Sequence, residues 1–192
     1  FLACSRNGYV CNPSLHQNYT VAEVRQLLSR IECKALFAQP GWGGDAATAD
    51  IFSAARELGH VMRLYALPPL HARGPAMPGG AHPMPTPGDA AQAVQPPATT
   101  NADHVVYLAF TSGTTGTPKG VLVSHRGLDN LAEAQGRLFG IGPDSRVLQF
   151  ASMSFDASVS EIAMTFRAGA ALVLAGRLSL SPGPELIALL RD

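Results

Sequence analysis

Charged residues are scarce in this sequence. Lysine, arginine, aspartate and glutamate together make up 15% of its 192 residues, and the formal net charge is zero. A nucleic-acid-binding surface needs an excess of basic side chains, so no such surface is predicted. No apolar run comes near the ~18 residues that a membrane-spanning helix requires. We therefore expect neither a nucleic-acid partner nor a membrane partner.

Cysteine is also rare. The three cysteines, Cys4, Cys11 and Cys33, form no C-x-x-C pair, and their number is odd. This pattern indicates reduced thiols and a cytoplasmic location rather than a frame of disulfides. The chain begins at Phe1, without an initiator methionine or a secretory signal pattern, so we expect a piece of a longer protein.

Apolar patterns typical of strands and helices alternate along most of the chain. Thr20 to Glu23 has the spacing of a helix capping box, and the apolar residues that follow lie on one helical face. We expect strands over 8–13, 34–38, 61–67, 107–110, 121–123, 146–151 and 170–175, and helices over 20–31, 45–58, 126–139, 157–167 and from 181 onward. The alternation predicts an α/β fold with parallel-rich sheets and flanking helices.

Residues 74–103 interrupt this alternation. They are rich in proline and glycine and hold almost no charged or large apolar side chains, so they cannot cover the face of a helix or sheet. We expect a loop or linker here. The predicted organisation is a first α/β portion over 1–73, the linker over 74–103, and a second portion over 104–192.

The most specific string is YLAFTSGTTGTPKG at residues 107–120, a strand that breaks into a loop of glycine and hydroxyl residues. The glycines let backbone N–H groups approach an oxyanion closely, the hydroxyls are further donors, and Lys119 adds a positive charge. The residues expected to hold phosphate are Thr111, Ser112, Gly113, Thr114, Thr115, Gly116 and Lys119. The pattern predicts a polyphosphate site, with Lys119 as its catalytic cation.

The spacing of this loop excludes a Walker A motif. Walker A reads G-x-x-x-x-G-K-[ST] and a helix follows it directly. Here Pro118 stands where the second glycine is needed, Gly120 follows Lys119, and the next residues are strand-like. An ordinary hairpin turn is the alternative, but it requires no lysine. The string TSGTTG-x-PKG instead resembles the adenylate-forming (AMP-binding) ligases, which include acyl-CoA synthetases, luciferases and the adenylation domains of nonribosomal peptide synthetases.

A second string, Phe155-Asp-Ala-Ser158, resembles the FDxS motif of amino-acid-activating adenylation domains. The resemblance implies that Asp156 pairs with the α-amino group of the substrate and that Ala157 and Ser160 line the side-chain pocket. The alternative is that Asp156 simply caps the following helix. Ser158 and Glu161 have the spacing of a capping box of their own, which would make that cap unnecessary.

The resemblance also implies a fold and a reaction. The chain would form part of the large N-terminal domain of an adenylate-forming ligase. Its substrate carboxylate would attack Mg-ATP to give an acyl-adenylate, and a phosphopantetheine thiol, on CoA or a carrier protein, would take the acyl group. We expect no transition-metal site, because the six histidines show no paired spacing: His16, His60, His71, His82, His104 and His125.

The two ends of the chain resemble different branches of this family. Residues 8–46 resemble acyl- or aryl-CoA synthetases, whereas the part after the phosphate loop resembles peptide synthetases. Either the chain is an unusual member, or two genes are joined at the motif that both branches share. Three functions stay open: an amino-acid adenylation fragment, an acyl- or aryl-CoA ligase fragment, and a non-catalytic nucleotide-binding remnant.

Overall fold

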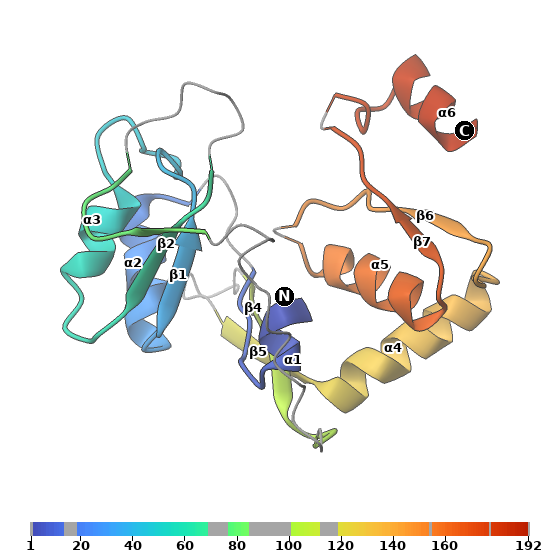
Figure 1. Ribbon diagram of the computed structural model, residues 1–192, viewed down its shortest axis with the longest axis horizontal. Helices are drawn as coiled ribbons and strands as arrows, with labels where there is room; N and C mark the ends of the chain where they lie inside the picture. The colour runs from blue at the N-terminus through green and yellow to red at the C-terminus, as the bar shows by residue number, and fades with distance from the viewer. Residues whose placement is uncertain are drawn as a thin grey trace. The chain divides into compact units, whose positions relative to one another are not determined.

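The computed structural model describes residues 2–13, 19–68, 77–84, 101–111, 119–153, 155–176 and 178–191. They fall into two compact units: one combines Phe1–Ser14 with Pro96–Asp192, and the other covers Leu15–Gln95 (Figure 1). These are called the 96–192 unit and the 15–95 unit below. The division into residues 1–73, 74–103 and 104–192 that we expect from the sequence stays a prediction.

The 15–95 unit is built of helices and a parallel sheet. Its elements are α2 (Val21–Arg30), β1 (Ala35–Ala38), α3 (Ile51–Arg56), β2 (Arg63–Ala66) and β3 (His82–Pro83). The strands pair in the order β1-β2-β3, and both pairings are parallel. The predicted alternation of strand and helix with parallel pairing is confirmed in this unit.

The core of this unit joins both helices to one face of the sheet. Its buried residues are Val21, Val24 and Leu28 from α2, Leu36 and Ala38 from β1, Ile51, Phe52 and Ala55 from α3, and Leu64 and Ala66 from β2. On the strands these residues alternate with Phe37 and Tyr65, whose rings stack with centroids 4.7 Å apart. Because successive strand residues point to opposite faces, this stack lies on the face away from the helices.

The predicted capping box at the start of α2 is confirmed. The Thr20 side chain accepts a hydrogen bond from the Glu23 N–H at 3.3 Å, and the Glu23 carboxylate accepts one from the Thr20 N–H at 2.8 Å. The helix expected over 45–58 is shorter, because Asp45 accepts a hydrogen bond from the Val21 N–H at 2.8 Å and so belongs to the start of α2. α3 begins only after the next aspartate, its N-cap.

The strand expected over 8–13 is wrong, and the linker expected over 74–103 contains one short paired segment. Residues 8–13 form no strand beyond a single parallel bridge between Cys11 and Tyr107. Within the linker expected over 74–103, His82–Pro83 pairs with β2 at the edge of the sheet, where a residue without an N–H is tolerated. Residues 85–100 lie outside the described part of the chain.

The 96–192 unit holds the rest of the secondary structure. Its elements are α1 (Leu2–Arg6), β4 (Val105–Thr111), β5 (Lys119–Ser124), α4 (His125–Leu138), β6 (Arg146–Leu148), α5 (Asp156–Arg167), β7 (Ala171–Val173) and α6 (Pro184–Arg191). β4 and β5 are antiparallel, and β6 and β7 are parallel. The helices expected over 126–139 and 157–167 are confirmed within one residue. The last helix begins at Pro184, later than the expected start at Ser181.

α4 ends at Leu138, close to Gly140 as predicted, and Gly140 has a φ of 65°. The Gly140 N–H donates to the Arg137 carbonyl at 3.3 Å, and the Ile141 N–H donates to the Gly136 carbonyl at 2.9 Å. This is the Schellman arrangement, which favours glycine because the backbone enters the left-handed region. It turns the chain from α4 toward β6.

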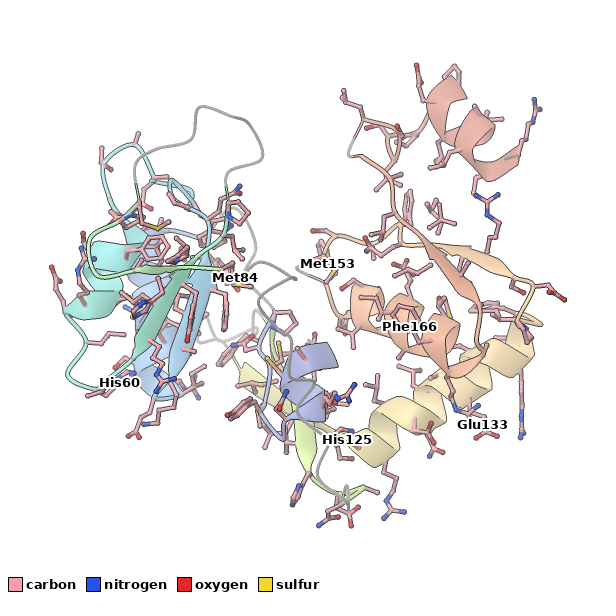
Figure 2. All side chains as sticks on the ribbon, viewed as in Figure 1. His60, Met84, His125, Glu133, Met153 and Phe166 are labelled. Atoms are coloured by element: carbon pink, nitrogen blue, oxygen red, sulfur yellow. The ribbon has the colours of Figure 1, made fainter. Side chains whose placement is uncertain are left out.

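The apolar stripe of α4 is mostly uncovered. Ala132 is buried, but Leu131 is 44% and Leu138 78% exposed. Elsewhere in the unit, Met153 and Phe166 are about half exposed (Figure 2). Monomeric globular proteins rarely leave large apolar patches exposed to solvent.

In the described part of the chain, no helix has both the length and the apolar character needed to span a membrane.

Candidate active site

The predicted phosphate loop joins two antiparallel strands. β4 ends at Thr111, β5 begins at Lys119, and these two residues pair in the register of the strands. The other predicted phosphate ligands lie outside the described residues: Ser112, Gly113, Thr114, Thr115 and Gly116. Because a strand rather than a helix follows Lys119, the exclusion of a Walker A loop is confirmed.

Gly120 allows β5 to pass close to the side chains of β4. A Cβ atom at this position would lie 3.1 Å from the Leu108 Cδ1 and 3.4 Å from the Phe110 Cε1. The Leu108 side chain would have to shift by a few tenths of an ångström to accept a larger residue, whereas the Phe110 ring would be at an ordinary contact distance. The glycine therefore supports the register that sets Lys119 opposite Thr111. Lys119 is exposed at this end of the hairpin, where its charge is accessible to a phosphate in solution.

Asp156 is the first residue of α5 and is exposed. The preceding residue, Phe155, is the N-cap, and it makes no side-chain capping hydrogen bond. Asp156 is also the acidic residue of the first turn, where the positive end of the helix dipole favours a carboxylate. Its position suits both a helix-stabilising role and the binding of a substrate cation.

The capping box expected at Ser158 and Glu161 is wrong. The Ser158 hydroxyl is buried and donates backward to the Phe155 carbonyl at 2.7 Å. The Glu161 carboxylate accepts a hydrogen bond from the Ala151 N–H, at 3.2 Å to each oxygen, and from the Gln149 amide at 3.5 Å. Glu161 thus fixes the segment that leads from β6 into the FDxS motif. The sequence did not indicate this role, because the spacing of Ser158 and Glu161 is typical of a helix capping box.

The two small residues that are predicted to line the substrate pocket differ in their surroundings. Ala157 is exposed, whereas Ser160 is partly buried and its hydroxyl donates to the side-chain oxygen of Gln135 on α4. Asp156 and Ser160 are four positions apart on α5, so they share one face of the helix. No sequence pattern indicates Gln135 as a partner, because it lies on a different helix.

Tyr107, on β4, is the residue that connects the hairpin electrostatically with Asp156. Its side chain belongs to a small core with Val106 and Val159. Burial first, then the negative charge of Asp156, then the Cys11 thiol raise the pKa of Tyr107. The carboxylate of the FDxS motif therefore acts on a side chain of the strand that leads into the phosphate loop.

We expect Asp156→Asn to lower the pKa of Tyr107, because one of the charges that oppose tyrosinate is removed. The value should stay above that of an unfolded tyrosine, about 10, because burial remains. Since the folded-state pKa is the higher one, stability is lost as the pH rises from about 10 toward the folded-state pKa. This loss should begin at the same pH in both proteins and continue to higher pH in the wild type. NMR titration of labelled tyrosine measures the pKa, and urea unfolding at stepped pH measures the stability.

Asp129→Asn is the matched control for this titration. Asp129 is an exposed carboxylate of the same unit whose partner is Arg167, at 2.9 Å. The control should leave the Tyr107 titration in place. An identical Tyr107 midpoint in the wild type and the Asp156 variant would contradict the interaction.

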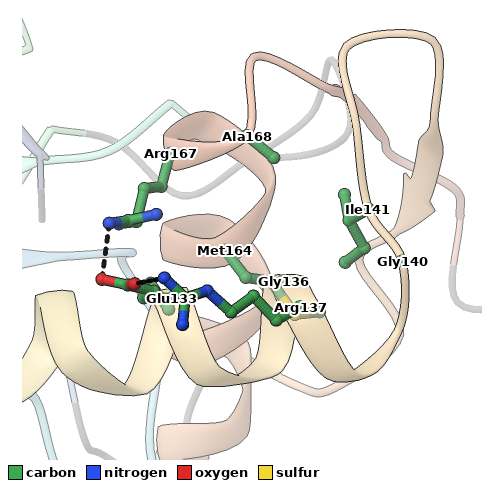
Figure 3. Close-up of a pocket in the computed structure, with 9 residues that line it drawn as sticks. Glu133, Gly136, Arg137, Gly140, Ile141, Met164, Arg167 and Ala168 are labelled. Carbon is green, nitrogen blue, oxygen red and sulfur yellow. Dashed lines mark hydrogen bonds and ion pairs between the residues drawn. The ribbon is translucent and has the colours of Figure 1, made fainter.

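The cavity of about 270 Å³ between α4 and α5 contains none of the predicted site residues (Figure 3). Apolar atoms of Ala132, Ile141 and Met164 line it. At its rim, Glu133 binds two arginines: Arg137 one turn along α4, and Arg167 on α5 at 2.8 Å. Because the carboxylates of Glu133 and Asp129, which also pairs with Arg167, together balance the charge of the two arginines, the cavity is a poor site for an anion such as ATP.

The histidines of the described residues have structural surroundings. The His60 ring nitrogen Nε2 is hydrogen-bonded to the Cys33 carbonyl at 2.9 Å, and His82 lies on the edge strand β3 beside Tyr65. Within the described ranges, no three histidine, cysteine, aspartate or glutamate side chains gather as a metal ion would need.

Comparison with known proteins identifies relatives of one kind. A family model described as AMP-binding enzyme matches residues 1–191. A linear gramicidin synthase from Brevibacillus parabrevis is 56% identical over 89 residues, which are 46% of this chain and 1% of that protein. Phosphinothricin tripeptide synthetase PhsC from Streptomyces viridochromogenes is 53% identical over 90 residues, 47% of this chain and 8% of that protein. The chain therefore spans only a small fraction of these relatives.

Solved structures share the fold at low sequence identity. The Vibrio cholerae adenylation domain AlmE, crystallised with glycyl-adenosine-5'-phosphate, is 22% identical with a TM-score of 0.68, over 98% of this chain and 35% of that one. The anthranilate CoA ligase AuaEII, crystallised with anthranoyl-AMP, is 18% identical with a TM-score of 0.68, over 90% of this chain and 32% of that one. The expected fold class is confirmed.

Proposed function

Because the chain belongs to the AMP-binding enzyme family, we propose that it forms part of an ATP-dependent ligase that activates an amino acid as its acyl-adenylate. The observation that carries this proposal is the exposed carboxylate of Asp156 at the start of α5, coupled to Tyr107 on the strand before the phosphate loop. The sequence relatives, which are peptide synthetases, support the amino-acid substrate.

In this proposal the β4–β5 hairpin holds ATP. Thr111, Lys119 and the loop between them bind the β- and γ-phosphates, and the cation of Lys119 offsets charge on the departing pyrophosphate. Mg²⁺ arrives with ATP, bound to its phosphate oxygens. The enzyme forms no covalent bond in this step, so its rate depends on placing the substrate carboxylate beside the α-phosphorus.

The amino acid lies against α5. Its ammonium pairs with Asp156, and the opposite charge offsets the cost of removing the ammonium from water. Ala157 and Ser160 line the side-chain pocket, and their small size leaves room for a bulky substrate. The activated acyl group then passes to a phosphopantetheine thiol on a carrier protein or CoA. A cytoplasmic location stays a prediction.

An acyl- or aryl-CoA ligase is the second candidate, favoured by the resemblance of residues 8–46 to that branch. To separate the two, the whole 192-residue chain, which includes residues 8–46, is grafted into a complete amino-acid adenylation domain in place of the matching segment. ATP–pyrophosphate exchange is then measured with amino acids, and with aryl and fatty acids. Exchange that depends on amino acids supports the proposal. Exchange that occurs only with aryl or fatty acids would contradict the proposal and support the acyl- or aryl-CoA ligase.

ATP binding by the 192-residue chain itself should depend on Lys119. We expect a Kd of about millimolar, because a single loop facing hydrated phosphates forms only screened contacts. Lys119→Ala should weaken binding by about 2–5-fold, the equivalent of one exposed charge pair. Lys34, the only other lysine in the sequence, provides the control, since Lys34→Ala should leave affinity unchanged. Equal effects of the two substitutions in an NMR titration would place the phosphates elsewhere.

A further inference from the structure

Glu161 lies in the second turn of α5 and holds the backbone that follows β6. The Ala151 N–H donates to both oxygens of its carboxylate, at 3.2 Å each, and the Gln149 side-chain amide donates to one of them at 3.5 Å. The same Gln149 amide also donates to the Ala151 carbonyl. Hydrogen bonds to an ionised acceptor are stronger than those between neutral groups. The contact between Glu161 and Ala151 is called the Glu161 anchor below.

Both sides of the Glu161 anchor are tied to regular structure. The Gln149 N–H donates to the Val173 carbonyl at 2.9 Å, which continues the parallel pairing of β6 with β7. On the helix side, the Thr165 hydroxyl donates to the Glu161 carbonyl at 2.6 Å, and Thr165 is completely buried. The anchor therefore joins the small sheet to α5 at a defined place.

Hydrogen bonds continue from the anchor to the aspartate of the FDxS motif. Ser152 follows Ala151, and its carbonyl accepts the Phe155 N–H at 2.8 Å. The Phe155 carbonyl accepts the Ser158 N–H at 3.1 Å and the Ser158 hydroxyl at 2.7 Å. Asp156 lies in the chain between Phe155 and Ser158, so these bonds determine where its backbone stands.

From this geometry we propose that Glu161 is a positioning residue for amino-acid recognition, because its hold on Ala151 sets where Asp156 stands at the head of α5. The inference rests on the proposed function, in which the Asp156 carboxylate pairs with the substrate ammonium. Glu161 touches no substrate in this account and acts through the backbone. A displacement of about 1 Å in a binding group can cost about 10²-fold in rate. Loss of the anchor should therefore weaken the pairing although the charge of Asp156 remains.

The first test is amide hydrogen exchange in the 192-residue chain, followed residue by residue by NMR. Glu161→Ala removes the acceptor of the Ala151 N–H and, if the anchor sets the motif, loosens the bonds that follow it. Exchange should become at least about tenfold faster at Ala151, Phe155 and Ser158. Faster exchange at Ala151 alone would overturn the proposal, because the motif would then keep its place without Glu161.

Three controls accompany the exchange measurement. The Thr165 amide, later in α5, should keep its rate, because alanine is a good helix former. Glu185→Ala removes an exposed carboxylate from the first turn of α6 and should leave all of these rates unchanged. Glu161→Gln keeps one oxygen for the Ala151 N–H but leaves an NH₂ group facing the Gln149 amide, so its rates should lie between those of the wild type and Glu161→Ala. Equal acceleration by Glu161→Ala and Glu185→Ala would overturn the proposal.

The second test is amino-acid-dependent pyrophosphate exchange by the grafted adenylation domain. Glu161→Ala should raise the KM for the amino acid at least about tenfold and leave the Kd for ATP within about twofold. Glu161→Gln should again lie between this variant and the wild type. A merely structural loss would lower kcat through the fraction of active enzyme and leave KM unchanged, and that result would overturn the proposal.

A double-mutant cycle tests whether Glu161 acts through Asp156. In Asp156→Asn the ammonium has already lost its counter-charge, so adding Glu161→Ala should reduce activation by less than about threefold more. Losses that multiply in full would overturn the proposal, because Glu161 would then act elsewhere. A wild-type graft without amino-acid-dependent exchange would refute the proposed function and the recognition role with it. The exchange rates of the 192-residue chain decide separately whether Glu161 sets the position of Asp156.

Discussion

Replacing Asp156 with asparagine in the grafted adenylation domain is expected to reduce amino-acid activation by about 10²–10⁴-fold, because removal of one partner from a desolvated ion pair costs about 3–5 kcal/mol. Asparagine keeps the shape of the side chain but leaves the substrate ammonium without a counter-charge. Binding of ATP should change little, since we propose that its phosphates bind to the β4–β5 hairpin instead. The measurement is kcat/KM for amino-acid-dependent pyrophosphate exchange beside the Kd for ATP.

Asp129→Asn serves again as the control, because it removes an exposed carboxylate that pairs with Arg167 on the same unit. It should leave activation within about twofold, as is usual for exposed ion pairs. Retained activation in the Asp156 variant, or an equal loss of ATP binding, would assign Asp156 to stabilising the first turn of α5. That alternative gained weight when the structure showed that Ser158 and Glu161 do not cap this helix.

Phe52→Ala should destabilise the 15–95 unit by about 3–5 kcal/mol, the usual cost of a large cavity in a core. Phe52 is completely buried between α3 and the sheet. Trp42 is the single tryptophan of the sequence and packs against this core, so its fluorescence follows the unfolding of this unit. Urea unfolding should show a lower midpoint with an unchanged slope.

Phe37→Ala is the matched control for the core variant. Phe37 is 49% exposed and its ring stacks on Tyr65, so its removal should cost only about 0.5–1.5 kcal/mol. Similar losses from both substitutions would mean that the helices do not cover the sheet as described. A near-neutral Phe52→Ala would lead to the same conclusion.

Local patterns in the sequence predicted several elements well. The helices α4 and α5 match within one residue, and the α2 capping box has the predicted partners. Each of these features depends on residues within one or two turns of each other. Their spacing, and therefore their hydrogen bonds and buried face, can be read directly from the order of the residues.

Partners distant in sequence were the source of the errors. Asp45 has the surroundings of a helix start, but it bonds to Val21, on a helix that precedes it. Glu161 has the spacing of a cap, but it holds the backbone at Ala151. Each carboxylate accepts a hydrogen bond from a backbone N–H that lies near it only in the folded chain. The local spacing of residues therefore does not indicate which N–H it binds.

The sequence alone determined the α/β class, the phosphate-loop motif between two strands, and the carboxylate at the head of α5. Each depends on residue type and short-range period, which are present before the chain folds. Only the tertiary structure decided that the charge of Asp156 raises the pKa of Tyr107 and that Ser160 bonds to Gln135. These pairs depend on which elements pack together, and a hydrogen bond or charge interaction acts only over the few ångströms that packing provides.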